Sequence, residues 1–187
     1  MRYPHLNRNF LLYLIAIVTT ACTSSQPQLQ AIDTKVELDR FMGDWYVIAS
    51  IPIDFWFASE AGGHNGVETY QLRDDGKIAT TYTFRQDSFD GEEKQFTPVA
   101  WVHNKETNAE WRMQFMWPFR SAYLIAYLDE DYEQTVIGVP NRTYVWIMTR
   151  SPEISEDEYN KLVSIVGELG YDTSLLQRVP QRWPEEK

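Results

Sequence analysis

Gly43-Asp44-Trp45-Tyr46 is the stretch of this sequence that decides its fold. A short amphipathic run, residues 36–42, precedes it, and an apolar run, residues 47–51, follows it. About a hundred residues later the chain reads Tyr144-Val145-Trp146-Ile147-Met148-Thr149-Arg150 and then turns helical. A single Gly-x-Trp is common by chance, so the order carries the information. A Trp opens the first strand of a β domain, an Arg closes its last strand, and one helix follows.

The residues between Trp45 and Arg150 alternate between apolar and polar. Residues 110–115 and 78–85 repeat with a period of two, which is typical of half-buried strands. Asp74-Asp75-Gly76 is a hairpin signal, because Gly tolerates a positive φ. Short strands joined by tight turns predict an all-β antiparallel barrel or sandwich. The predicted strands are 45–51, 66–72, 77–85, 94–103, 110–115, 122–128, 134–139 and 144–150.

One helix is predicted after the last strand. Ser155 and Glu158 fit a capping box, in which each side chain accepts from the other residue's backbone N–H. Apolar residues recur at helical spacing from Leu162 to Leu169, and Gly170 is a natural stop. We expect the apolar stripe to pack on the outside of the β domain.

This order of elements resembles the lipocalin family, most closely its bacterial outer-membrane lipoprotein branch, over residues 36–183. The resemblance implies an eight-stranded antiparallel up-and-down barrel with one C-terminal helix packed outside. It also assigns structural roles to Gly43, Trp45 and Arg150. The Trp would plug the closed end of the barrel, and the Arg would lie across its ring in a cation–π contact. None of the three is expected to touch a ligand.

The N-terminus resembles a lipoprotein signal. Residues 1–21 hold two arginines, no acid and an apolar run too short to span a bilayer, which predicts a cleaved export signal. Cys22, the single cysteine, would then be diacylated and anchor the protein. Thr19 departs from the Leu usual three positions earlier, so an incidental cysteine or a soluble secreted form stays open. Thr23, where inner-membrane lipoproteins usually carry Asp, favours the bacterial outer membrane.

The predicted domain organisation has three parts: the signal 1–21, the lipidated cysteine with a flexible tether 22–34, and the lipocalin domain 35–187. Cleavage of 21 of the 187 residues leaves 166, enough for one domain with a real core. Loss of the two signal arginines takes the net charge from −10 to −12. So acidic a chain is not expected to bind nucleic acid.

An eight-stranded barrel has room for one small ligand, so the inward positions are the candidate site. The alternative is that these aromatic residues fill a solid core. An apolar cavity would suit an acyl chain. The candidate inward residues are Tyr70, Tyr82, Phe84, Trp111, Met113, Phe115, Tyr123, Tyr127, Tyr144 and Trp146.

The apolar loop after the first strand, with Phe55, Trp56 and Phe57, is predicted to lie over the open mouth. It is either a lipid-contacting rim or a lid packed inward. Glu68 shares a strand face with Tyr70. It therefore either faces the cavity, with its pKa raised by desolvation, or faces water if the register is shifted.

The sequence predicts a binding protein rather than an enzyme. No Ser lies in a Gly-x-Ser-x-Gly elbow. His64 and His103 have no partners at metal-ligand spacing, so neither a metal nor another cofactor is expected. The resemblance implies that a fatty acid or lysophospholipid is stored or moved in the cell envelope. Two alternatives remain: an enzyme acting on an envelope lipid, which would cluster histidines or carboxylates in the cavity, and a structural protein with a filled barrel. The sequence leaves the oligomeric state open.

Overall fold

A computed structural model describes residues 26–55 and 58–183. The predicted signal, Cys22, Trp56 and Phe57 lie outside the described residues. No helix in the described ranges is both long and apolar enough to cross a membrane.

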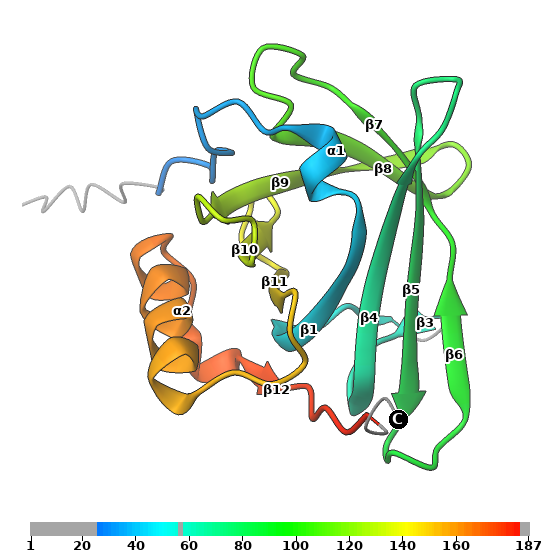
Figure 1. Cartoon of the computed structure of the whole chain (residues 1–187), viewed down its shortest axis with the longest axis vertical. Coiled ribbons are helices and arrows are strands. Elements are labelled where there is room, and N and C mark those ends of the chain that lie inside the picture. Colours follow the sequence, from blue (N-terminus) through cyan, green and yellow to red (C-terminus); the bar gives the residue numbers. More distant parts are fainter. Residues whose placement is uncertain (1–25, 56–57, 184–187) are drawn as a thin grey trace, which may run out of the picture.

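The main sheet is a closed antiparallel barrel (Figure 1). Each strand pairs with its neighbour, and the last strand returns to pair with the first, Tyr46 opposite Thr149. The eight-stranded barrel predicted from the sequence is therefore confirmed. Its strands are β1 (Gly43–Ile51), β4 (Gly63–Leu72), β5 (Ile78–Gln86), β6 (Glu93–Phe96) with β7 (Val99–Val102), β8 (Glu110–Met116), β9 (Phe119–Leu128), β10 (Gln134–Gly138) and β11 (Val145–Thr149).

The predicted strand 94–103 is divided into β6 and β7 at Thr97-Pro98. Pro98 has no N–H to give to a ladder. Its carbonyl instead accepts from both the N–H (3.2 Å) and the hydroxyl (2.7 Å) of Thr80. Both pieces still pair with β5, so they occupy one position in the barrel.

Several short elements lie outside the barrel wall. A one-turn helix, α1 (Leu38–Phe41), crosses one end of the barrel (Figure 1). A small hairpin, β2 (Asp54–Phe55) with β3 (Ala58–Ser59), lies in the loop between β1 and β4. A 3-10 turn, η1 (Thr173–Leu175), and the short strand β12 (Gln177–Arg178) follow the C-terminal helix, and β12 pairs with β1.

Helix α2 (Glu156–Glu168) packs alongside the barrel, as predicted (Figure 1). Both halves of its capping box are formed: Ser155 N donates to Glu158 Oε2 at 2.8 Å, and Glu158 N donates to Ser155 Oγ at 3.2 Å. Leu162 and Val166 are completely buried against outward side chains of the sheet. Gly170 follows with a φ of +88°, which ends the helix.

Tyr127 lies on this outer side, so the prediction that it faces the interior is wrong. Val136 of β10 pairs with Tyr127, but Ile137 pairs with Ile125, which leaves Ala126 as an extra residue in β9. Such a bulge shifts the alternation by one position. Ile125 therefore faces the barrel interior, whereas Tyr127 packs in the cluster beneath α2.

The segment expected to be a flexible tether is packed along the barrel from residue 27 onward. Leu29 is buried in the outer cluster, and its N–H donates to Pro140 O at 2.9 Å. Ile32 N donates to Ile125 O at 2.9 Å, and Arg142 donates to Pro27 O at 2.8 Å. The expectation that 22–34 is a flexible tether is wrong for residues 27–32, because the apolar side chain of Leu29 is buried against the barrel.

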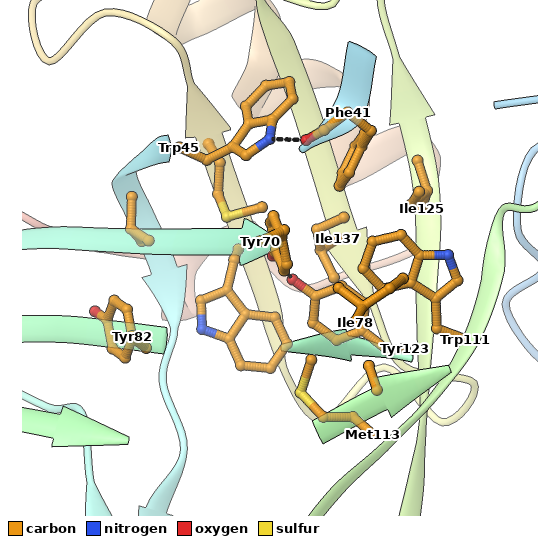
Figure 2. Packing of buried hydrophobic residues seen from close by; sticks show 14 of the residues in the cluster. Phe41, Trp45, Tyr70, Ile78, Tyr82, Trp111, Met113, Tyr123, Ile125 and Ile137 are labelled. Carbon is orange, nitrogen blue, oxygen red and sulfur yellow. Dashed lines mark hydrogen bonds between the residues drawn. The ribbon is translucent and has the colours of Figure 1, made fainter. Parts of the chain in front are cut away.

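Trp45 and Arg150 meet at the end of the barrel that carries α1. The Arg150 guanidinium carbon lies 3.8 Å from the centroid of the Trp45 ring. Trp45 is completely buried, and its indole N–H donates to Phe41 O at 2.9 Å (Figure 2). Gly43 has a φ of +94°, and a Cβ there would come within 3.4 Å of the Arg150 guanidinium. The geometry that the resemblance implied for these three residues is present.

We expect Trp45→Ala to lower the free energy of unfolding by about 3–5 kcal/mol, because it removes a large buried ring. Arg150→Ala should cost less, and the two changes together should cost less than their sum because the residues are in contact. Chemical denaturation of the two single variants and the double variant measures this. Trp117→Ala is the control, since that ring is 81% exposed and its loss should change stability little. Strict additivity of Trp45→Ala and Arg150→Ala would reject the contact.

Candidate functional site

A cavity of about 790 Å³ opens at the end of the barrel opposite Trp45. We call it the mouth cavity. Its wall is mostly apolar and comes from strand ends and from the loops between strands. Among the side chains that line it are Ile53, Phe55, Met113, Phe115, Tyr123, Tyr144 and Trp146.

The mouth cavity narrows inward to a second space of about 20 Å³, which we call the floor pocket. Glu60, Phe96, Met113, Phe115, Tyr123 and Trp146 line both spaces, so the floor pocket is the inner end of the mouth cavity. Four residues line the floor pocket but not the mouth cavity: Glu68, Tyr82, Pro98 and Met148.

The rest of the barrel interior is filled. Trp45, Tyr70 and Trp111 pack around Phe41, with their ring centroids 5.0–5.5 Å from that of Phe41 (Figure 2). The Tyr70 and Tyr123 hydroxyls are hydrogen bonded, and the Trp111 indole N–H donates to Asn108 O at 2.8 Å. The barrel is therefore solid at its closed end and hollow at its mouth, which decides against a completely filled barrel.

The predicted inward residues divide between these two halves. Met113, Phe115, Tyr144 and Trp146 line the mouth cavity, and Tyr82 lines the floor pocket. Tyr70 and Trp111 belong to the filled half. Phe84 is buried inside, stacked on Tyr82 at 5.2 Å, without lining either space. Alternation identified the interior face, but it carries no information on depth along the barrel axis.

Two carboxyl groups, those of Glu60 and Glu68, line the floor pocket. Glu60, which follows β3, is 7% exposed, and its Oε2 accepts from Trp146 Nε1 at 3.0 Å and from Ile53 N at 3.5 Å. Glu68 of β4 is 9% exposed and, within the described residues, accepts no side-chain hydrogen bond. The inward alternative for Glu68 is the correct one.

Burial sets the protonation of both groups. It raises the pKa of the Glu60 carboxyl from 4.5 to about 7, although the hydrogen bonds from Trp146 and Ile53 oppose the rise. Burial also raises the pKa of Glu68 well above 4.5, and the nearby charge of Glu60 adds to the effect. Desolvation favours the neutral form of a carboxyl, and a neighbouring negative charge favours it further.

Sequence reasoning missed Glu60. It lies in the loop between β3 and β4, where no alternation assigns a face. Residues 51–63 hold two acids, Asp54 and Glu60, among apolar and small residues, and nothing in the sequence shows which of the two is buried. By contrast, the spacing of Glu68 to Tyr70 had made the inward position one of two alternatives.

Large apolar side chains are exposed around the mouth. Phe55 lines the cavity while 47% exposed, so this part of the predicted mouth loop is at the rim. The end of β8, the turn that follows it and the start of β9 add four more exposed apolar residues: Phe115, Met116, Trp117 and Phe119. We call these four residues together with Phe55 the rim. An exposed apolar patch of this kind marks a site of contact with lipid, ligand or protein.

The family model of the lipocalin-like domain matches residues 36–181. The chain belongs to the lipocalin family. Its barrel is similar to insecticyanin from the tobacco hornworm Manduca sexta, with a TM-score of 0.62 and 14% identity over 85% of this chain and 86% of that one. This likeness concerns the fold alone.

Two relatives at the sequence level are similar over most of their length. Temperature-induced lipocalin-1 of Arabidopsis thaliana is 32% identical over 78% of this chain and 80% of its own. Outer membrane lipoprotein Blc of Vibrio cholerae is 26% identical over 94% of this chain and 99% of its own. This lipocalin is therefore Blc-like, as the resemblance indicated.

The raised pKa of Glu60 predicts a pH dependence of stability. Between pH 4.5 and about 7 the folded lipocalin holds a proton that the unfolded chain releases, so the free energy of unfolding falls as the pH rises. For Glu60 alone the loss is roughly 3 kcal/mol, at about 1.4 kcal/mol per pH unit. Glu60→Gln keeps an oxygen acceptor for Trp146 but cannot titrate. It should therefore remove the decrease in the free energy of unfolding that Glu60 causes between pH 4.5 and about 7.

Urea denaturation at pH 4.5, 6 and 7.5 measures the free energy of unfolding of the parent and of Glu60→Gln. Glu106→Gln is the matched control, because Glu106 is exposed in the loop between β7 and β8, and its curve should follow the parent. If Glu60→Gln retains the full pH dependence of the parent, the raised pKa is wrong.

Proposed function

We propose that this lipocalin binds a single-chain lipid, a fatty acid or lysophospholipid, in its mouth cavity and stores or moves it in the cell envelope. The observation that carries the proposal is the hollow apolar half of the barrel. A volume of about 790 Å³ lies in the range of small-molecule sites, roughly 300–1,000 Å³. Each CH₂ transferred from water to such a wall contributes about 0.8 kcal/mol.

The charge of the cavity supports an orientation for an anionic lipid. Among the described residues, the side chains that line the mouth cavity and the floor pocket include no Lys, Arg or His. A carboxylate or phosphate would also approach Glu60 and Glu68 at the floor. Such a lipid therefore enters tail first and keeps its headgroup in water at the mouth.

We further propose that the protein is a lipid-anchored protein of the bacterial outer membrane, acylated at Cys22. The support is the signal-like N-terminus and the likeness to a relative named Outer membrane lipoprotein Blc. Two acyl chains anchor a protein stably, whereas one does so only marginally. The exposed rim around the mouth fits exchange of lipid with a membrane surface.

One observation favours a second candidate, an enzyme that acts on an envelope lipid. Glu60 and Glu68 are the clustered carboxylates that this alternative requires, and a carboxyl with a pKa near 7 suits general acid–base chemistry. The remaining side chains of the floor pocket are aromatic, Met and Pro, so they supply no alcohol or thiol nucleophile. Mass spectrometry of envelope lipids incubated with the parent and with Glu60→Gln distinguishes the two: any Glu60-dependent product favours the enzyme.

The binding proposal predicts saturable, one-to-one binding of palmitate and of palmitoyl lysophospholipid by the delipidated protein. Tryptophan fluorescence reports it, because Trp146 lines the cavity. Phe115→Ala should weaken binding about tenfold, at roughly 25 cal/mol per Å² of lost contact. Phe115 is already 52% exposed, so its loss should leave the fold intact.

Leu72→Ala is the matched control for Phe115→Ala. Leu72 is an apolar residue of β4 that is 44% exposed at the closed end, away from the cavity. Its removal should leave lipid affinity unchanged. Equal losses in both variants, or no saturable binding of either lipid, would mean that lipid only adheres to exposed apolar surface.

The anchor proposal predicts that Cys22→Ser abolishes acylation and releases the protein into the soluble fraction. Metabolic labelling with a palmitate analogue in a Gram-negative host, followed by membrane fractionation, measures both effects. A parent protein that incorporates no label dependent on Cys22 contradicts the anchor.

A further inference from the structure

The floor pocket contains an acceptor that has no partner. Glu68 is 9% exposed and lines the pocket, and no described residue donates a hydrogen bond to its carboxyl. Glu60 uses only Oε2 for Trp146 and Ile53, which leaves Oε1 without a donor within the same ranges. Buried carboxyl oxygens are costly unless a donor meets them. The pocket therefore offers acceptors to a ligand that brings donors.

Aromatic rings surround these acceptors. Tyr82, Tyr123, Trp146 and Phe96 line the pocket, and the Tyr123 and Trp146 centroids are 6.1 Å apart. Ring faces attract cations, and a combination of aromatic walls with carboxylates is a general means of binding an ammonium group. The absence of Lys, Arg and His from the described lining leaves the pocket without a cation of its own.

The size of the pocket limits the headgroup. A cavity that holds one water needs roughly 10–15 Å³ by this kind of measure, and the floor pocket has about 20 Å³. A primary ammonium group is close to a water molecule in size and carries N–H donors. A phosphate or a trimethylammonium group is too large for the space.

We propose that the floor pocket is a recognition site for the primary ammonium group of a long-chain amine, held by Glu60 and Glu68 with its hydrocarbon chain in the mouth cavity. The inference rests on the proposed lipid binding and adds a ligand class to it. An amine enters head first, the reverse of the orientation of a fatty acid. The same cavity thus accepts two kinds of single-chain lipid in opposite directions.

The titratable groups around this site make the affinity for an amine depend on pH. The groups that face the ammonium site are Glu60, Glu68, Tyr82 and Tyr123, with Tyr70 hydrogen bonded behind Tyr123. Burial raises the pKa of each of these tyrosines well above 10, so they stay neutral. The pKa of Glu60 is raised to about 7. Affinity for the amine should therefore rise with pH through 7, as the carboxyl ionises while the amine, with a pKa near 10.4, stays charged.

The test compares amphiphiles that share one tail. Dodecylamine, dodecanol, dodecanoate and dodecyltrimethylammonium are titrated, below their micellar concentrations, into the delipidated protein. At pH 8 dodecylamine should bind at least tenfold more tightly than each of the other three. Its affinity should fall by about tenfold between pH 8 and pH 6, whereas that of dodecanol should not change.

Glu68→Gln should remove the preference for dodecylamine and leave the affinity for dodecanol unchanged. Glu60→Gln, which keeps an acceptor for Trp146, should do the same and serves if Glu68→Gln does not fold. Glu106→Gln, an exposed acid outside the cavity, should retain the preference. This control excludes a general attraction of the acidic protein for cations.

Each outcome decides between defined alternatives. Equal binding of all four amphiphiles, or a preference for dodecylamine that survives both glutamine substitutions, overturns the ammonium site and leaves the lipid cavity in place. Comparable binding of dodecylamine and dodecyltrimethylammonium also overturns it, because the latter cannot enter the floor pocket. If no amphiphile binds, the proposed lipid-binding function fails as well.

Discussion

The guanidinium group of Arg150 is the point on which the closed end of the barrel depends. It donates to the carbonyl oxygens of Arg40 (2.8 Å), Phe41 (3.1 Å), Met42 (2.9 Å), Asp44 (2.7 Å) and Tyr132 (3.3 Å). It thereby satisfies the carbonyls at the end of α1 while its face covers Trp45. A planar group with five donors is suited to this role, which Lys could not fill. Because one end is fixed and filled in this way, the mouth cavity lies toward the other end of the barrel.

The interior is divided between stability and binding. Its closed half is packed with rings at ordinary contact distances, as in a protein core. Its open half lacks that packing, so it contributes less to stability and is available to a ligand. Glu60 and Glu68 lie where the two halves meet. Buried carboxyls without full hydrogen bonding lower stability, and proteins commonly retain such groups at sites that serve function.

Much of this architecture was predictable because it rests on local rules. Alternation predicted the strands and the capping box predicted the start of α2. Closure into a barrel, rather than a sandwich, was implied by the resemblance to lipocalins that Trp45 and Arg150 carry. The errors have physical causes that a single sequence conceals. The bulge at Ala126 moved Tyr127 to the outer face, and depth along the axis placed Trp111 in the core but Met113 in the cavity wall. Glu60 was missed because loops have no period. The predicted strand 94–103 ran through Pro98, although a proline, which lacks an N–H, indicates a break in a strand.

The packing of the N-terminal segment has a geometric consequence for an acylated chain. Leu29 is held at Pro140, and Gln28 lines the mouth cavity, so the barrel receives its N-terminus at the open end. Cys22 precedes Pro27 by five residues, which span at most about 18 Å when fully extended. Acylation at Cys22 would therefore keep Pro27, and with it the mouth of the barrel, within about 18 Å of the anchored residue. A lipid would then pass between membrane and barrel without diffusing through bulk water. The length of the linker between Cys22 and Pro27, rather than affinity for the membrane surface, would set how far the protein can deliver the lipid.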